Sequence, residues 1–149
     1  MSEIAIETAA SEEVVTTVLG RFNNREIAEA IAFFAEEFTF KDYGIGLEFK
    51  SKDRLGEFFQ KTRELFPDSC LQLESILTSV DHVVGEGTLR TTVTEPFYGA
   101  LSRKVRVLLH GVSVVRTKRG QITDWSDYYD GLTSRRTALA SYFEDWVEL

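Results

Sequence analysis

Apolar residues recur at the spacing of an α-helix in the first third of the chain. One stripe follows Ser11, the predicted N-cap, because Glu12 and Glu13 then lie in the first turn, where acidic side chains are favourable. This stripe consists of Val14, Val15, Val18, Leu19 and Phe22. A second stripe follows Asn24 and consists of Ile27, Ala30, Ile31 and Phe34. The spacing predicts two successive helices and leaves residues 1–10 as a loose tail.

The spacing changes to that of a β-strand around residue 38. Apolar and polar side chains alternate from Phe38 to Asp42, and the glycines that follow end or bend this strand. A third helix is predicted between Ser51 and Pro67. Its expected buried side consists of Leu55, Phe58, Phe59, Thr62, Leu65 and Phe66.

Beyond Cys70 the chain alternates as strands. The predicted strands cover residues 70–79, 82–94, 103–116 and 121–129, and a last helix is predicted from Thr133 to about Val147. Helices that precede a run of strands indicate an α+β domain. We expect one domain over residues 1–149, with a cone-shaped, strongly curved, mostly antiparallel sheet wrapped around the N-terminal helices and a cavity at its open end.

Composition and charge exclude several classes of protein. The chain has 149 residues and a net charge of −7, which argues against binding nucleic acid through its phosphates. It contains no apolar run of about 20 residues and no secretory leader, so we expect a cytoplasmic protein that does not enter a membrane. A single cysteine, two separate histidines and no nucleotide or zinc signature predict neither a metal site nor a cofactor.

Candidate chemistry is concentrated in residues 122–130, where three carboxylates and three aromatic residues occur together. In a strand, Trp125, Asp127 and Tyr129 share one face. A carboxyl group between two large aromatic side chains loses water, and this raises its pKa towards neutral pH. Asp127 is therefore the primary candidate for an acid or base.

The element order and two segments, residues 34–42 and 120–130, resemble the nuclear-transport-factor-2-like superfamily. This superfamily includes ketosteroid isomerases, SnoaL-like polyketide cyclases and limonene epoxide hydrolases. The resemblance extends from about residue 11 to residue 130. It implies a cystatin-like α+β barrel in which residues 34–42 run from the second helix into the first strand.

The resemblance also implies roles for two carboxylates. Asp127 matches the final-strand carboxylate with which epoxide hydrolases position and activate water. Asp42 falls where ketosteroid isomerases keep the carboxylate that shuttles a proton. The epoxide hydrolase mechanism further needs an Arg and an Asp two residues apart, and this chain has Thr88 and Arg90 at those positions. The departure removes the general acid of that reaction.

The predicted pocket has its own chemistry. If the strand face that carries Thr88 and Arg90 is concave, Arg90 can reach Asp127 and polarise a substrate carbonyl. Asp127 or Asp42 is then the base that abstracts a proton next to that carbonyl, with Tyr129 as a second donor to the oxyanion. The expected walls around a small, lipophilic, ring-containing substrate are Trp125, Phe40, Val107, Leu109 and Thr88.

The sequence leaves three functions open. The first is an isomerase, cyclase or hydrolase that needs no cofactor, with epoxide-hydrolase-like water activation as its variant. The second is a ligand carrier or sensor with the same cavity, and the third is a dimerisation module. A homodimer is expected through the outer face of the sheet, where Val112 and Val114 follow His110, a residue that faces away from the cavity.

Overall fold

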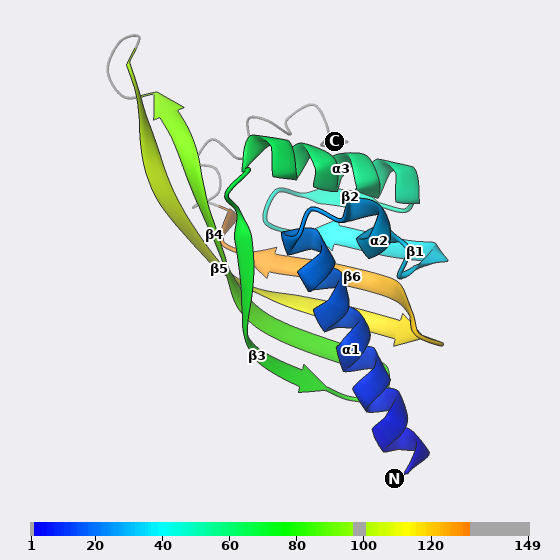
Figure 1. The fold of residues 1–149 in the computed structure, drawn as a ribbon. Coiled ribbons are helices and arrows are strands. Elements are labelled where there is room, and N and C mark those ends of the chain that lie inside the picture. The colour runs from blue at the N-terminus through cyan, green and yellow to red at the C-terminus, as the bar shows by residue number, and fades with distance from the viewer. Residues whose placement is uncertain (1, 97–100, 132–149) are drawn as a thin grey trace.

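The computed structural model describes residues 2–96 and 101–131 and contains a six-stranded sheet with helices packed on one side (Figure 1). The order across the sheet is β2-β1-β6-β5-β4-β3. β1 and β6 are parallel, whereas the other neighbours are antiparallel. The strands are β1 (Phe34–Asp42), β2 (Leu47–Phe49), β3 (Cys70–Thr78), β4 (His82–Pro96), β5 (Ser102–Lys118) and β6 (Gln121–Tyr129).

The sheet is strongly curved but does not close, so the predicted α+β cone is confirmed as an open one. The long strands β4 and β5 bend across the molecule, and β2 and β3 remain as the two edges (Figure 1). α1 (Glu3–Asn23), α2 (Ile27–Ile31) and α3 (Lys52–Leu65) lie on the concave side. No described helix is both long and apolar enough to cross a membrane.

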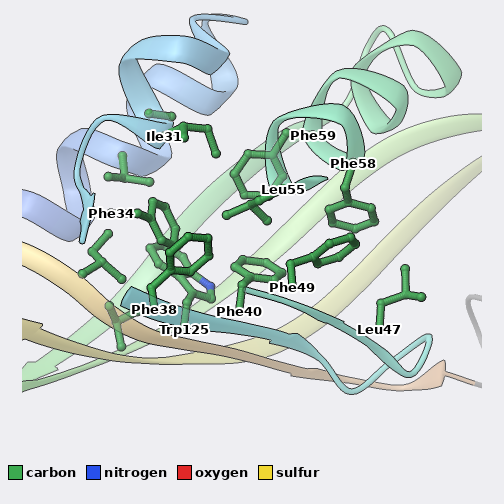
Figure 2. Close-up of a cluster of buried hydrophobic side chains, with 14 of the residues drawn as sticks. Ile31, Phe34, Phe38, Phe40, Leu47, Phe49, Leu55, Phe58, Phe59 and Trp125 are labelled. Carbon is green, nitrogen blue, oxygen red and sulfur yellow. The ribbon is translucent and has the colours of Figure 1, made fainter. Parts of the chain in front are cut away.

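The core lies where these helices meet β1, β2 and β6 (Figure 2). Phe34, Phe40 and Trp125 stack on the concave face of neighbouring strands, with Phe40 and Trp125 at a centroid distance of 6.3 Å. Phe59 of α3 meets Phe40 edge to face at 5.5 Å. Such pairs contribute about 0.5–1.5 kcal/mol each beyond their area burial. This aromatic layer fixes α3 over the end of the sheet where β1 and β6 run together.

The third helix follows its predicted signals closely. Ser51 is its N-cap and accepts a hydrogen bond from the backbone N–H of Arg54. Its buried side includes Leu55, Phe58 and Phe59, as the helical spacing predicts. The predicted helix is therefore confirmed.

The N-terminal prediction was wrong in two respects. Residues 3–10 belong to α1, whose N-cap is Ser2, so they are not a loose tail. Ser11 lies inside the helix and is buried, and its Oγ is 2.7 Å from Oγ1 of Thr117. The Ser11 side chain therefore connects the helix to the sheet, and Ser2 caps the helix.

The second helix is shorter than its apolar stripe. It ends at Ile31, and β1 begins at Phe34, which is fully buried in the strand. Residues 34–42 therefore form one strand rather than a helix that runs into a strand. An apolar residue at position 34 suits either element, because both bury it. The predicted helix from Thr133 to Val147 lies outside the described residues.

Candidate functional site

A cavity of about 170 Å³ lies between the concave face of the sheet and helices α1 and α3. Apolar side chains dominate its walls. Those that reach it from the helices are Val15, Val18, Leu19, Phe22, Phe58 and Phe59, and those from the strands are Phe34, Phe40, Leu71, Leu73, Leu89, Leu109 and Trp125. An apolar cavity of about 150 Å³ can hold a single aromatic ring, so this space suits a ligand of about that size.

Glycines widen the floor of the cavity. Gly87 of β4 and Gly111 of β5 are register partners, and both line the space. A Cβ at Gly87 would approach Gln72 O to 2.7 Å, and one at Gly111 would approach Tyr128 O to 2.6 Å. Neither position tolerates a side chain, because the neighbouring backbone is too close.

Asp42 and Asp127 bring two carboxyl groups to one end of the cavity. They are register partners on the parallel strands β1 and β6, so their side chains emerge on the same face. Asp42 is 6% exposed, and Asp127 is partly buried; both line the cavity. Residues far apart in the sequence thus form one acidic pair.

Asp127 is held through a single oxygen. Its Oδ1 accepts hydrogen bonds from Ser113 Oγ at 2.5 Å and from Trp125 Nε1 at 2.7 Å. Within the described part of the chain, no residue donates to Oδ2. The geometry therefore leaves Oδ2 as the oxygen that can exchange a proton with a bound molecule.

Asp42 is held by backbone and by a phenol. Its Oδ1 accepts a hydrogen bond from the N–H of Ile45 at 3.1 Å, and the hydroxyl of Tyr129 donates to the same carboxylate. The pKa of Tyr129 is raised mainly by burial and, to a smaller extent, by the negative charge of Asp42. Tyr129 consequently remains a proton donor at every physiological pH.

Burial raises the pKa of both acids, and the charge of Asp42 adds to the shift of Asp127. Burial, as the larger cause, and the charge of Asp42 raise the pKa of Asp127 to about 7. The hydrogen bonds from Ser113 and Trp125 oppose this shift. Burial also raises the pKa of Asp42, against the hydrogen bonds from Tyr129, Ile45 and Gly44. Two carboxylates this close do not both ionise readily. Asp127 therefore titrates near neutral pH, beside a carboxyl group whose own pKa is raised.

The family follows from the sequence as well as from this geometry. Residues 12–137 match the model of the SnoaL-like polyketide cyclases. The chain belongs to this family. No protein with a curated description matches it.

Solved structures resemble this SnoaL-like protein in fold. A protein of Shewanella denitrificans, described as a putative SnoaL-like polyketide cyclase, has a TM-score of 0.73 at 12% identity, covering 87% of this chain and 97% of the other. AclR, described as a putative hydroxylase of Streptomyces galilaeus, has a TM-score of 0.71 at 20% identity over 88% and 86% of the two chains. A hypothetical protein of Catenulispora acidiphila with a ketosteroid isomerase-like fold, solved in complex with trimethylamine, has a TM-score of 0.66 at 20% identity over 78% and 85% of the two chains. At these identities the likeness establishes the fold alone.

The structure places Arg90 away from the site of this SnoaL-like protein. Gly85, Gly87 and Leu89 of β4 line the cavity, so Arg90 points to the outer face, where it is exposed. The expectation that Arg90 reaches Asp127 was wrong. The alternation of β4 is clear in the sequence, but its cavity side is marked by glycines, which carry no apolar signal.

Two expected wall residues also lie elsewhere. Thr88 is buried on the outer face, where its Oγ1 donates to Glu74 Oε1 at 2.6 Å and lies 2.8 Å from His110 Nδ1. Val107 is buried in the core but is not among the residues that line the cavity. His110 shares the outer face with Thr88, as its parity predicts.

The remaining predicted positions converge on the cavity. Phe40, Leu109, Trp125 and Tyr129 line it together with the two carboxylates. Sequence reasoning missed Ser113, which binds Asp127. A signal was present, because Ser113 has the same parity on β5 as Leu109 and is the nearest polar residue on that face. No group of three potential metal ligands occurs among residues 2–96 and 101–131.

Proposed function

We propose that this SnoaL-like protein is an acid/base enzyme, of isomerase or cyclase type, that needs no cofactor. Its substrate is a small, largely apolar, ring-containing carbonyl compound, and Asp127 removes a proton from the carbon next to the carbonyl. The observation that supports this is a carboxyl group that lines the cavity, has a pKa of about 7 and accepts no hydrogen bond from a described residue at Oδ2. A base is most effective when its pKa is near the working pH.

The proposed step begins with the carboxylate form of Asp127. Its Oδ2 takes the proton from carbon, and the electron pair left behind moves to the carbonyl oxygen to give an enolate. If the enolate is conjugated with a carbon–carbon double bond, return of the proton to the far carbon gives isomerisation. In ring closure the enolate carbon attacks a second carbonyl, whose oxygen receives the electron pair and then the proton from Asp127. Both outcomes use the same first step.

Asp42 and Tyr129 have supporting roles in this proposal. The charge of Asp42 raises the pKa of Asp127 and so makes it a stronger base. Tyr129 has one hydroxyl proton, which it donates to Asp42 in the free site; it can replace the distant Arg90 by turning that hydrogen bond to the enolate oxygen. Asp42 remains the alternative base, since it faces the same cavity.

Two other functions use the same cavity. Asp127 can activate a water molecule, as in epoxide hydrolases, although the outward position of Arg90 removes a cationic partner for that reaction. A carrier or sensor needs only the apolar walls and one polar end. Exchange of substrate hydrogen for deuterium separates proton abstraction from both alternatives, because neither of them removes a proton from carbon.

The experiment screens one-ring ketones by thermal shift and then follows loss of α-proton NMR signals in D₂O. Asp127→Asn should slow exchange of a bound ketone by at least about 100-fold, the scale of acid–base catalysis. Asp124→Asn is the matched control, since Asp124 is exposed on the same strand and has the opposite parity. Exchange at the wild-type rate in a folded Asp127→Asn variant would exclude Asp127 as the base.

We also propose that the protein is a homodimer formed through the outer face of the sheet. Leu108 on this face is 48% exposed, Tyr128 is 47% exposed, and Leu77 near its edge is 72% exposed. Val112 and Val114 are partly exposed, and Val112 and its register partner Tyr128 also border the cavity. An apolar face of this kind is typically covered by a partner, and closed two-fold pairing is the commonest way to cover it.

A further inference from the structure

The acidic end of the cavity discriminates between ligands by their charge. Asp42 and Asp127 lie side by side at the apolar cavity, with Asp42 buried and Asp127 partly buried. Electrostatic interactions are stronger in such a place than in bulk water. An anionic group that enters the cavity is therefore repelled, and a cationic group is attracted.

The walls favour a cation as well. The rings of Phe40, Trp125 and Tyr129 line the cavity beside the carboxyl groups. Phe40 and Trp125 lie close together in the core, with an angle of 20° between their planes (Figure 2). The faces of aromatic rings carry partial negative charge and attract alkylammonium groups. Carboxylates and ring faces thus act in the same direction.

The charged and titratable groups around Asp127 are few. Among the described residues that line the cavity they are Asp42 on β1 and Asp127, Tyr128 and Tyr129 on β6. The described lining residues of α1, α3, β3, β4 and β5 are apolar side chains, glycines, Thr62 and Ser113. A positive charge that enters would therefore meet these carboxylates as its nearest charged groups.

We propose that the ligand of this cavity is an organic ammonium compound with about one ring, whose cationic nitrogen lies against Asp42 and Asp127. The volume of about 170 Å³ sets the size, and the carboxyl pair sets the charge. The inference names the charge class of the substrate and rests on the cavity of the proposed function. Binding and proton abstraction are measured separately, so either can fail alone.

A proton must leave the site when such a cation binds. In the free site Asp127 carries a proton below about pH 7, whereas an ammonium group stabilises its ionised form. The affinity should follow the ionised fraction of a group with a pKa of about 7. It should therefore rise up to about 30-fold from about pH 5.5 to about pH 8, and then level off.

The test compares benzylamine, benzyl alcohol and benzoate, which share a ring and differ in charge, by isothermal titration calorimetry of the full chain. At about pH 8, benzylamine should bind at least about tenfold more tightly than benzyl alcohol, and benzoate should bind most weakly. Benzylamine remains protonated throughout this range, so any pH dependence belongs to the protein. Titration in two buffers of different ionisation enthalpy should detect proton release below about pH 7.

Two variants test whether the preference for benzylamine and its pH dependence arise from the carboxyl pair in the cavity. Asp127→Asn should remove the rise in benzylamine affinity with pH and most of the preference for benzylamine over benzyl alcohol. Asp124→Asn changes the net charge equally on the outer face and should retain both.

Equal or tighter binding of benzyl alcohol or benzoate would overturn the inference, as would a benzylamine affinity that Asp127→Asn leaves unchanged. Failure of all three probes to bind would overturn it too. Exchange of ketone α-protons through Asp127 without selective benzylamine binding would refute this inference and leave the proposed function intact. Selective benzylamine binding with normal exchange in Asp127→Asn would refute only the proposed function.

Discussion

At the scale of single residues, Asp127 is enclosed in the folded chain and solvated in the unfolded one, and this difference connects its chemistry to stability. Its pKa is about 7 in the fold and about 3.9 in an unfolded chain. Between these values the folded state holds the proton more tightly than the unfolded state does. The free energy of unfolding therefore decreases as the pH rises from about 4 to about 7, and changes no further through this group at higher pH.

Replacing Asp127 with Asn should stabilise the protein at alkaline pH. Asn retains an Oδ1 that accepts from Ser113 and Trp125 but cannot ionise, so the cost of burying the charge disappears. We expect a gain of about 1–3 kcal/mol in the free energy of unfolding at about pH 8, and little difference at about pH 4. Urea denaturation at both pH values measures this. A variant less stable than the wild type at pH 8 contradicts the assignment.

Ser113 should set the pH at which Asp127 acts. Its hydroxyl donates at 2.5 Å to Asp127 and stabilises the carboxylate form. A hydrogen bond worth about 1 kcal/mol corresponds to about 0.7 pH unit, so Ser113→Ala should move the midpoint of the pH–rate profile upward by that amount.

The measurement for Ser113 is the rate of α-proton exchange against pH. Ser126→Ala is the control, because Ser126 lies on β6 with the opposite parity to Asp127 and should leave the midpoint unchanged. A lower rate with an unshifted midpoint would mean that Ser113 only supports the structure.

At the scale of elements, the edges of the sheet need protection, and α1 protects one of them. β3 pairs with β4 on one side only. On its other side, Asn23 at the end of α1 donates from Nδ2 to Leu71 O at 2.8 Å and accepts from Leu71 N at 2.9 Å. The amide thus satisfies two backbone groups that would otherwise be exposed at an edge strand.

Asn23→Ala should therefore destabilise the domain and loosen β3. Loss of two hydrogen bonds to the backbone should lower the free energy of unfolding by about 1–3 kcal/mol. Hydrogen exchange at the amide of Leu71 should accelerate by at least about tenfold. Asn24→Ala is the matched control, since Asn24 is the adjacent, exposed C-cap residue. Equal effects of the two changes would refute the role of Asn23.

The boundaries of the helices and strands agree with the local sequence pattern at some positions and differ from it at others. The limits of α3 and β6 agree with those predicted, because each has clear local signals: a capping serine for α3, and alternation between turns for β6. Phe34 was assigned to a helix and lies in β1, since burial alone does not distinguish the two. Residues 3–10 continue α1, although the exposed side chains of Ile4 and Ile6 give that segment no amphipathic pattern.

At the scale of the whole molecule, the outer face of the sheet determines whether the protein is a monomer or a dimer. If it pairs two copies, each substitution there acts twice because of the two-fold symmetry. Leu108→Lys should then weaken the dimer by about 100-fold or more, at about 1.4 kcal/mol per tenfold. Light scattering after size-exclusion chromatography at several concentrations measures the mass.

Ile4→Lys is the control for Leu108. Ile4 is an exposed apolar residue of α1, outside the sheet, and its replacement should leave the dimer unchanged. A wild-type protein that is monomeric at micromolar concentration, or a Leu108→Lys protein that remains dimeric, contradicts pairing through this face.

The sequence by itself determined the element order, the class of fold and the shared face of Trp125, Asp127 and Tyr129. These features depend on local periodicity, which each segment carries in its own residues. Only the tertiary structure decided that Asp42 stands beside Asp127, because their pairing depends on the register of two parallel strands distant in sequence. It also decided that β4 turns its glycines, rather than Arg90, towards the cavity. Periodicity defines two faces of a strand, but only packing selects which one is inside.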